Sequence, residues 1–217
     1  MKGREIMCGR FAIMFEPEEL RVMLGLGEVP AELTPNHNIS PGQGIPVVTN
    51  GTTRNVEIFK WGLVPGWAKN PSIGYKMINA RAETISEKPS FRNAFAKRRC
   101  LIPAGGFYEW KQEGNRKQPY LFQLKDKKPF TFAGLWERWQ DECGDELLSC
   151  TIITTMPNAL MAEYHDRMPV ILNEKARWRW LDNTAVTELR EMLKPYPAEE
   201  MTSPRKLDPF ELLKLAV

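Results

Sequence analysis

Residues 99–154 read RCLIPAGGFYEWKQEGNRKQPYLFQLKDKKPFTFAGLWERWQDECGDELLSCTIIT, and this stretch decides the fold. Its runs of aromatic and β-branched residues predict strands at 99–103, 106–111, 119–124, 130–139 and 146–154. Polar turn segments (EGNRK, KDKK and DECGD) separate most of these runs. Strands joined by short turns are typical of hairpins, so the middle of the chain predicts an antiparallel sheet.

Outside this stretch helical patterns are more frequent. The elements predicted before it are a strand at 9–13, a helix within 16–26, a hairpin with strands at 46–49 and 54–61, and a short helix at 89–97. Helices are predicted after it at 158–163, 173–181, 184–193 and, as a docked helix or tail, 207–217. Strands in the middle and helices at the end predict a single α+β domain with a curved, barrel-like, mostly antiparallel sheet flanked by helices.

The composition excludes several classes of protein. The 217 residues are 42% hydrophobic and 26% charged, which excludes a disordered tail, a collagen-like rod and a disulfide scaffold. No apolar run approaches the roughly 18 residues of a membrane span, so no membrane partner is expected. The start, MKGREIMCGRF, lacks the apolar core of a secretory signal. Four cysteines without such a signal predict reduced thiols in the cytoplasm.

The positive charge is concentrated in one part of the chain. The net charge is +3, but residues 76–118 contain ten Lys or Arg and only four Glu, a local charge of +6. A basic block of this kind can bind a polyanion. The alternative is an ordinary solvated surface, which the charge alone favours.

Few residues have the pattern of a chemical site. Of the two histidines, His165 lies beside Asp166 and Arg167 in a predicted loop, where catalytic and binding residues often occur. No C-x-x-C or H-E-x-x-H pattern is present, so neither a metal nor a cofactor is expected.

Cys8 directly follows Met7, and its chemistry depends on what precedes it. If the chain began at Cys8, an α-amine and a thiol would stand on adjacent carbons. This pair captures an aldehyde first as a Schiff base and then as a thiazolidine ring. An α-amine with a pKa near 7.8 is roughly 10% neutral at pH 7, far more than a lysine. The alternative is a buried structural cysteine near a fraying terminus.

Eight segments resemble, in the same order, the SOS-response-associated peptidase (SRAP) family. They are MCGRF, NISPGQGIPVV, KWGLVPGWAK, MINARAET, RCLIPAGGFYEWK, FAGLWERW, CTIITTMPN and HDRMPVIL, and they extend from about Met7 to Leu181. The resemblance implies a single domain around a barrel-like sheet. It also implies a sensor of abasic sites in single-stranded DNA that forms a thiazolidine crosslink through an N-terminal cysteine and shields the lesion.

The resemblance also implies roles for individual residues. Cys8 matches the nucleophile, Asn79 the residue that holds the abasic sugar, Glu109 the acid–base carboxylate and His165 the residue that assists sugar opening. The residues expected at the DNA are the phosphate-contacting Arg10, Arg81 and Arg167 and the groove residues Pro41 and Trp67. The alternative for Arg81 and Arg167 is a role in the fold, by pairing with Glu83 or Asp166.

Two positions depart from the family pattern. Residues 1–7 precede Cys8, so we expect a leader that is removed, by the self-cleavage that the word peptidase implies, or a misassigned start; residues 8–217 are then the SRAP-like domain. Ala68 follows Trp67 where some relatives carry a second tryptophan, which weakens the predicted unstacking of bases.

Three functions remain open from the sequence. The first is a monomeric crosslinking protein with lyase-like and self-processing peptidase activity, cytoplasmic and associated with the nucleoid when bound to abasic single-stranded DNA. The second is a cysteine hydrolase that uses Cys8 and His165 with Glu109 or Asn79. The third is a non-covalent single-strand binding module built on the basic block and on Trp61, Trp67 and Phe91.

Overall fold

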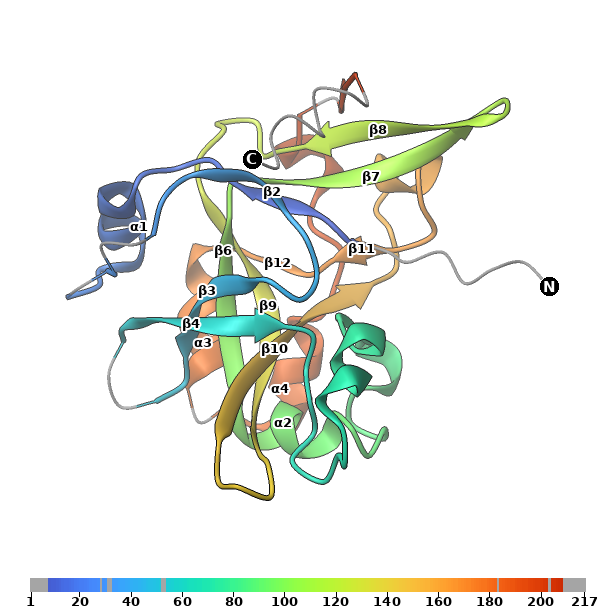
Figure 1. Ribbon diagram of the computed structural model, residues 1–217. Coiled ribbons are helices and arrows are strands. Elements are labelled where there is room, and N and C mark those ends of the chain that lie inside the picture. Colours follow the sequence, from blue (N-terminus) through green and yellow to red (C-terminus); the bar gives the residue numbers. More distant parts are fainter. Residues whose placement is uncertain are drawn as a thin grey trace.

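The computed structural model describes residues 8–27, 29–30, 33–51, 54–182, 184–202 and 204–208 (Figure 1). The predicted leader at residues 1–7 and the predicted C-terminal helix beyond Asp208 lie outside this part of the chain.

A closed ring of five strands forms the centre of the fold. The strands of the ring and its extensions are β3 (Gly44–Thr49), β4 (Val56–Trp61), β5 (Asn79–Arg81), β6 (Arg99–Ala104), β9 (Phe130–Gln140), β10 (Glu146–Thr155), β11 (Met168–Pro169) and β12 (Ile171–Leu172). The ring runs β10-β4-β3-β6-β9 and closes because β9 also pairs with β10. Within it only the β4–β10 pair is parallel, with Lys60 opposite Ser149. The predicted barrel-like, mostly antiparallel sheet is therefore confirmed.

A second sheet lies across one end of the barrel (Figure 1). Its strands are β1 (Phe11–Ile13), β2 (Asn36–Ile39), β7 (Gly106–Glu113), β8 (Arg116–Phe122) and β13 (Arg205–Lys206), in the order β13-β8-β7-β1-β2. Phe11 of β1 joins the two sheets because its ring centroid lies 5.2 Å from that of Trp61 on β4 and 5.9 Å from that of Phe132 on β9. All three side chains are fully buried, so this cluster fixes β1 to the barrel.

The helices are short and peripheral. They are α1 (Pro17–Leu24), α2 (Arg92–Lys97), α3 (Glu174–Leu181) and α4 (Val186–Glu191), with 3₁₀ turns η1 (Pro71–Lys76), η2 (Ala82–Thr84), η3 (Met161–Glu163) and η4 (Ala198–Glu200). α1 lies within the helix predicted at 16–26; it has Pro17 in its first turn and is capped after Leu24 by Gly25, whose φ of 54° is left-handed. None of the helices in the described residues is both long and apolar enough to cross a membrane.

One predicted helix is much shorter than expected. Residues 158–163 form only the single 3₁₀ turn η3. The Asn158 side chain accepts a hydrogen bond from the Met161 backbone N–H at 2.8 Å, and its own amide donates to the Tyr196 carbonyl at 2.7 Å. These side-chain bonds hold a local turn in place of a continuing helix.

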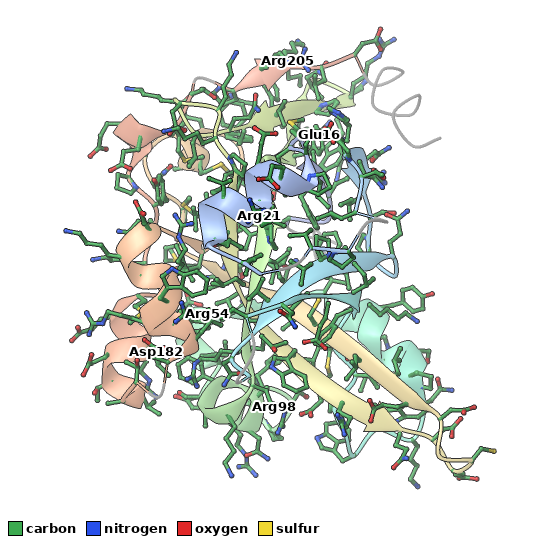
Figure 2. All side chains as sticks on the ribbon, turned by 90° about the vertical axis from the view of Figure 1, so that its left-hand side faces the viewer. Glu16, Arg21, Arg54, Arg98, Asp182 and Arg205 are labelled. Atoms are coloured by element: carbon green, nitrogen blue, oxygen red, sulfur yellow. The ribbon has the colours of Figure 1, made fainter. Side chains whose placement is uncertain are left out.

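The basic block does not form one surface. Arg99 is 2% exposed and donates hydrogen bonds to the carbonyls of Phe95, Ala96, Trp180 and Asp182. Arg98, at the lower end of the molecule in Figure 2, donates a hydrogen bond of 2.6 Å to Glu137 Oε2. Part of the block therefore serves the fold, and polyanion binding by the rest of the block stays a prediction.

The ring closure leads to a testable expectation at Gly134 on β9. A Cβ there would lie 2.8 Å from Cys100 Sγ, 2.8 Å from Ile102 Cδ1 and 3.1 Å from the Thr151 carbonyl oxygen. Gly134→Ala should lower the free energy of unfolding by about 1–3 kcal/mol, measured by urea denaturation. Gly27→Ala is the control because a Cβ at Gly27 meets nothing within 4 Å. Equal stabilities of the two variants would contradict this account of the ring.

Candidate functional site

Cys8 and Glu109 meet at the junction of β1 and β7. Phe11 pairs with Phe107, and the Tyr108 N–H donates to the Arg10 carbonyl at 3.0 Å, so β1 runs antiparallel along β7. This register brings the Cys8 backbone nitrogen to Glu109, where it donates a hydrogen bond of 2.6 Å to Oε1. The two predicted residues are thus in direct contact although 101 positions separate them.

Both members of this pair are shielded from water. Cys8 is 0% exposed and Glu109 2%. Burial raises the pKa of the Cys8 thiol well above its ordinary value, and the nearby charge of Glu109 raises it further. The thiol is therefore held in its protonated form beside an acceptor carboxylate.

The backbone at Cys8 has an unusual conformation. Its φ of 39° lies in the left-handed region, which a non-glycine residue adopts at a cost of roughly 1–2 kcal/mol. The hydrogen bond to Glu109 offsets this cost and directs the nitrogen towards the carboxylate.

Trp61 connects the strand that begins with Asn79 to the strand that follows Cys8. β5 pairs in parallel with β10, with Asn79 opposite Ile152. The Trp61 indole N–H donates to the carbonyl of Ile78 at 2.9 Å, while the same ring packs on Phe11. One side chain therefore contacts both the strand that follows Cys8 and the residue that precedes Asn79.

His165 lies on the other side of the same strand end. β11 follows it and pairs with β10 through Pro169 opposite Thr154, the residue that pairs with Arg81 of β5. His165 Nδ1 lies 2.9 Å from Asp166 Oδ1 and 3.2 Å from the Arg167 N–H.

The loop that carries His165 also docks beside Glu109. The Tyr164 ring packs edge-on against Tyr120 at 4.8 Å between centroids, and Tyr120 is the cross-strand partner of Glu109. The structure therefore gathers the four predicted catalytic residues onto adjoining elements: Cys8 and Glu109 in contact, Asn79 and His165 on either side of the end of β10.

Four of the residues predicted at the DNA lie at least partly at the surface. Trp67 is 61% exposed, Arg81 is exposed and Pro41 is half-buried. Arg10 is half-buried and donates from Nη1 to Asn38 Oδ1 at 2.5 Å.

Arg167 lies in a different environment. It is 7% exposed, donates to both carboxylate oxygens of Glu83 at 2.7 and 2.8 Å, and donates to the Thr154 carbonyl at 2.7 Å. This ion pair with Glu83 is the structural role expected from the sequence as the alternative for Arg167. The pair, called the Glu83–Arg167 clamp, connects the segment that follows Asn79 to the segment that follows His165. A phosphate contact by Arg167 stays a prediction.

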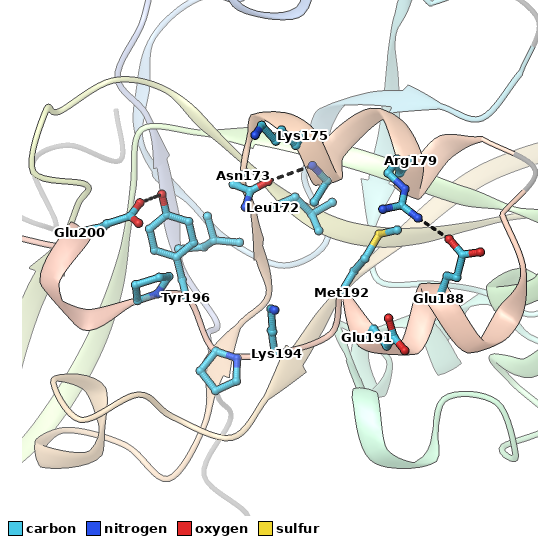
Figure 3. A pocket seen from close by; sticks show the side chains of 14 residues that line it. Leu172, Asn173, Lys175, Arg179, Glu188, Glu191, Met192, Lys194, Tyr196 and Glu200 are labelled. Carbon is cyan, nitrogen blue, oxygen red and sulfur yellow. Dashed lines mark hydrogen bonds and ion pairs between the residues drawn. The ribbon is translucent and has the colours of Figure 1, made fainter.

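An open cavity of about 470 Å³ lies elsewhere, between α3, α4 and η4 (Figure 3). It contains none of the predicted site residues, and its three basic and three acidic side chains balance. Two of its acids are already engaged, since Arg179 pairs with Glu188 and Tyr196 donates to Glu200. In the part of the chain that is described, no group of three or more His, Cys, Asp or Glu side chains is arranged to hold a metal ion.

Comparisons with known proteins agree on one family. The family model described as SOS response associated peptidase (SRAP) matches residues 7–205. Abasic site processing protein YoqW of Bacillus subtilis is 45% identical over 201 residues, covering 90% of both chains. Abasic site processing protein HMCES of Xenopus tropicalis is 30% identical, covering 90% of this chain and 72% of its own. A crystal structure of a protein from Bacteroides thetaiotaomicron aligns with a TM-score of 0.89 at 30% identity, covering 95% and 94% of the two chains.

The Glu83–Arg167 clamp should contribute stability that depends on pH. Burial raises the pKa of Glu83, but the hydrogen bonds and charge of Arg167 outweigh it and leave the pKa below its ordinary value of 4.5. The stabilisation is therefore present above about pH 4.5 and is lost as the pH falls through the lower pKa of the folded state.

Glu83→Gln should lower the free energy of unfolding by about 1–2 kcal/mol at pH 7, less than for a fully buried pair because the Glu83 side chain is 44% exposed. The difference from the unsubstituted protein should shrink in denaturant titrations below pH 4.5. Glu87→Gln, an exposed carboxylate on the same loop, is the control. A difference that is constant between pH 7 and pH 3 would rule out the clamp.

Proposed function

The chain belongs to the SOS response associated peptidase (SRAP) family, and on this premise we propose that it captures abasic sites in single-stranded DNA by covalent attachment to Cys8. The names of the relatives, abasic site processing proteins, support processing of this lesion in DNA. The observation that carries the covalent step is the 2.6 Å contact between the Cys8 nitrogen and the buried carboxylate of Glu109.

The proposed reaction joins both reactive atoms of Cys8 to one carbon. The amine nitrogen adds to the aldehyde carbon of the ring-opened sugar, and the resulting carbinolamine loses water to give an imine. The thiol sulfur then adds to the imine carbon while its proton passes to the nitrogen. Two bonds form to the former aldehyde carbon, one water leaves, and the product is a thiazolidine ring.

Glu109 is suited to move the protons of this sequence. At 2.6 Å from the nitrogen it can accept a proton from the α-ammonium and return it to the departing hydroxyl. Because burial keeps the thiol protonated, the same carboxylate can also take the thiol proton as the sulfur adds. In a site with so little exposure, water competes poorly for these transfers.

The proposal requires a free α-amine at Cys8. A peptide bond to Met7 delocalises the nitrogen lone pair into the carbonyl and prevents Schiff-base formation. The left-handed φ at Cys8 supports a terminal position, because its steric cost disappears when no preceding carbonyl is attached. We therefore include removal of residues 1–7, by hydrolysis of the Met7–Cys8 bond, in the proposed self-processing activity.

The remaining predicted residues take supporting roles in this proposal. Asn79 holds the sugar, His165 assists opening of the sugar ring, and Arg10 and Arg81 contact phosphates beside a groove shaped by Pro41 and Trp67. The protein acts as a monomer in the cytoplasm, on the nucleoid when bound to DNA, and shields the lesion.

A cysteine hydrolase is less well supported by the same geometry. Such an enzyme needs a thiolate, and a neighbouring imidazolium usually supplies the charge that stabilises it. Here burial and Glu109 raise the pKa of the Cys8 thiol, and the contacts of His165 are with its chain neighbours Asp166 and Arg167.

Glu109→Gln should slow crosslinking by about 10²–10⁴-fold while leaving equilibrium binding to single-stranded DNA nearly unchanged, because the amide keeps the shape but cannot exchange a proton. Timed quenching followed by denaturing gels gives the rate. Glu142→Gln, an exposed carboxylate in the β9–β10 turn, is the control and should react normally. A normal rate for the Glu109 variant would remove this carboxylate from the mechanism.

Protein purified without an N-terminal tag should begin at Cys8 by intact-mass measurement. Chains that keep residues 1–7 should form no heat-stable adduct with an abasic oligonucleotide, because their Cys8 nitrogen is an amide. Cys8→Ala should lose the stable adduct in either form. A heat-stable adduct on chains that retain Met1 would assign the reaction to another nucleophile.

A further inference from the structure

The segment between β4 and β5 has the composition of a nucleic-acid surface. Residues 58–82 contain four basic residues, Lys60, Lys69, Lys76 and Arg81, and no acidic residue. The ion pairs that occupy Arg98 and Arg167 come from other segments. This stretch therefore carries a net charge of +4 and is flanked by Glu57 and Glu83, the second of which interacts with the charge of Arg81.

The same segment carries the two most exposed aromatic rings of the described residues. Trp67 is 61% exposed and Tyr75 is 63% exposed. Large rings of this kind usually bury most of their area, so their exposure needs an explanation. Beside Trp67 a shallow pocket of about 260 Å³ is lined by Lys69 and Lys76 together with uncharged residues.

The exposed Tyr75 ring has defined contacts with Gly42 and Lys60. A Cβ on Gly42 would lie 3.3 Å from Tyr75 Cε1, so the ring edge rests on the Gly42 backbone. Gly42 has a φ of 91°, which strongly favours glycine. The Lys60 ammonium lies 5.6 Å from the ring centroid, within range of a cation–π interaction.

The loop that presents the two rings is rigid. A Cβ on Gly74 would lie 2.6 Å from the Gly62 carbonyl oxygen, so the two ends of the loop touch backbone to backbone. The Trp139 indole donates to the Ala68 carbonyl at 2.6 Å and fixes the residue after Trp67. Asn70 caps η1 by accepting the Ser72 N–H at 2.8 Å. The backbone that carries both rings is therefore fixed by contacts within the protein, which lowers the entropic cost of binding.

The position of Tyr75 connects it to the candidate site. The Gly42 N–H donates to the Trp61 carbonyl at 2.8 Å, and the Trp61 N–H donates to the Gln43 carbonyl at 2.9 Å. The indole of the same Trp61 holds the carbonyl of Ile78, next to Asn79. Tyr75 thus packs on Gly42, in the turn that follows Pro41, and this turn is hydrogen-bonded to the tryptophan that contacts Phe11 and the carbonyl of Ile78.

We propose that Tyr75 is a stacking site for a nucleobase of single-stranded DNA that flanks the captured lesion, with Lys60 beside it for the phosphate of that nucleotide. This inference rests on the proposed function and adds a second base position to the one at Trp67. Every base offers a π-face, so the site accepts any sequence. The net charge of +4 over residues 58–82 favours a polyanion over a protein partner.

Equilibrium binding of a fluorescein-labelled single-stranded oligonucleotide without a lesion tests the site. Tyr75→Ala should weaken binding about 5- to 100-fold, whereas Tyr75→Phe should bind as the unsubstituted protein does because it keeps the ring. Val22→Ala, equally exposed on α1, is the control. Lys60→Met should flatten the plot of log K against log salt by about 0.7, and Tyr75→Ala should leave that slope unchanged.

A second readout locates the base. With 2-aminopurine placed at successive positions beside an abasic site, Tyr75→Ala should restore fluorescence at one position and Trp67→Ala at another. Binding by Tyr75→Ala within twofold of the unsubstituted protein, equal loss in Tyr75→Phe, or tighter binding to duplex DNA would overturn the inference. Crosslinking to abasic DNA is scored separately on denaturing gels. If the unsubstituted protein forms no crosslink yet its binding depends on the Tyr75 ring, the proposed function fails and the stacking site stands.

Discussion

A buried carboxylate is costly unless it accepts hydrogen bonds, and Glu109, which is 2% exposed, accepts one from the backbone N–H of Cys8. This requirement connects the two layers of the molecule. β7 carries the carboxylate, β1 carries the donor, and Phe11 pins β1 to the barrel through Trp61. The barrel therefore shields the Glu109 carboxylate and the Cys8 thiol from water. The site forms where the second sheet packs against the barrel.

Local sequence patterns predicted where the strands lie, but they did not predict which strands pair to close the barrel. The runs at 130–139 and 146–154 agree with β9 and β10 to within a residue or so, because runs rich in β-branched and aromatic residues and bounded by turn segments are typical of strands. The ring closes through Lys60 opposite Ser149, a parallel pair between distant segments that leaves no local signal. The two-residue strands β11 and β12 are too short to show any period. Residues 158–163 failed as a helix because side-chain hydrogen bonds of Asn158 compete with helix formation.

Some residues of the candidate site could likewise be predicted from the sequence, and others only from the structure. Family motifs pointed to Cys8 and Glu109, and the β1–β7 register accounts for their contact. Arg167 was expected at a phosphate, with pairing to Glu83 or Asp166 as the alternative. Only its environment identifies the ion pair with Glu83, because charge in a sequence does not distinguish a surface arginine from a buried, paired one. Tyr75 was not singled out at all. A single tyrosine in a loop carries no pattern, and only its exposure beside Gly42 and Lys60 marks it.

The separation of 101 positions between Cys8 and Glu109 has a consequence for biosynthesis. A ribosome adds about 5–20 residues per second, so Cys8 leaves the exit tunnel on the order of 5–20 s before its carboxylate partner does. Throughout that interval the cysteine is exposed to metabolic aldehydes with no enclosing pocket. An amide-linked nitrogen is inert towards them. A short extension ahead of Cys8, lost only after the two sheets have met, would couple the reactivity of the residue to completion of the fold.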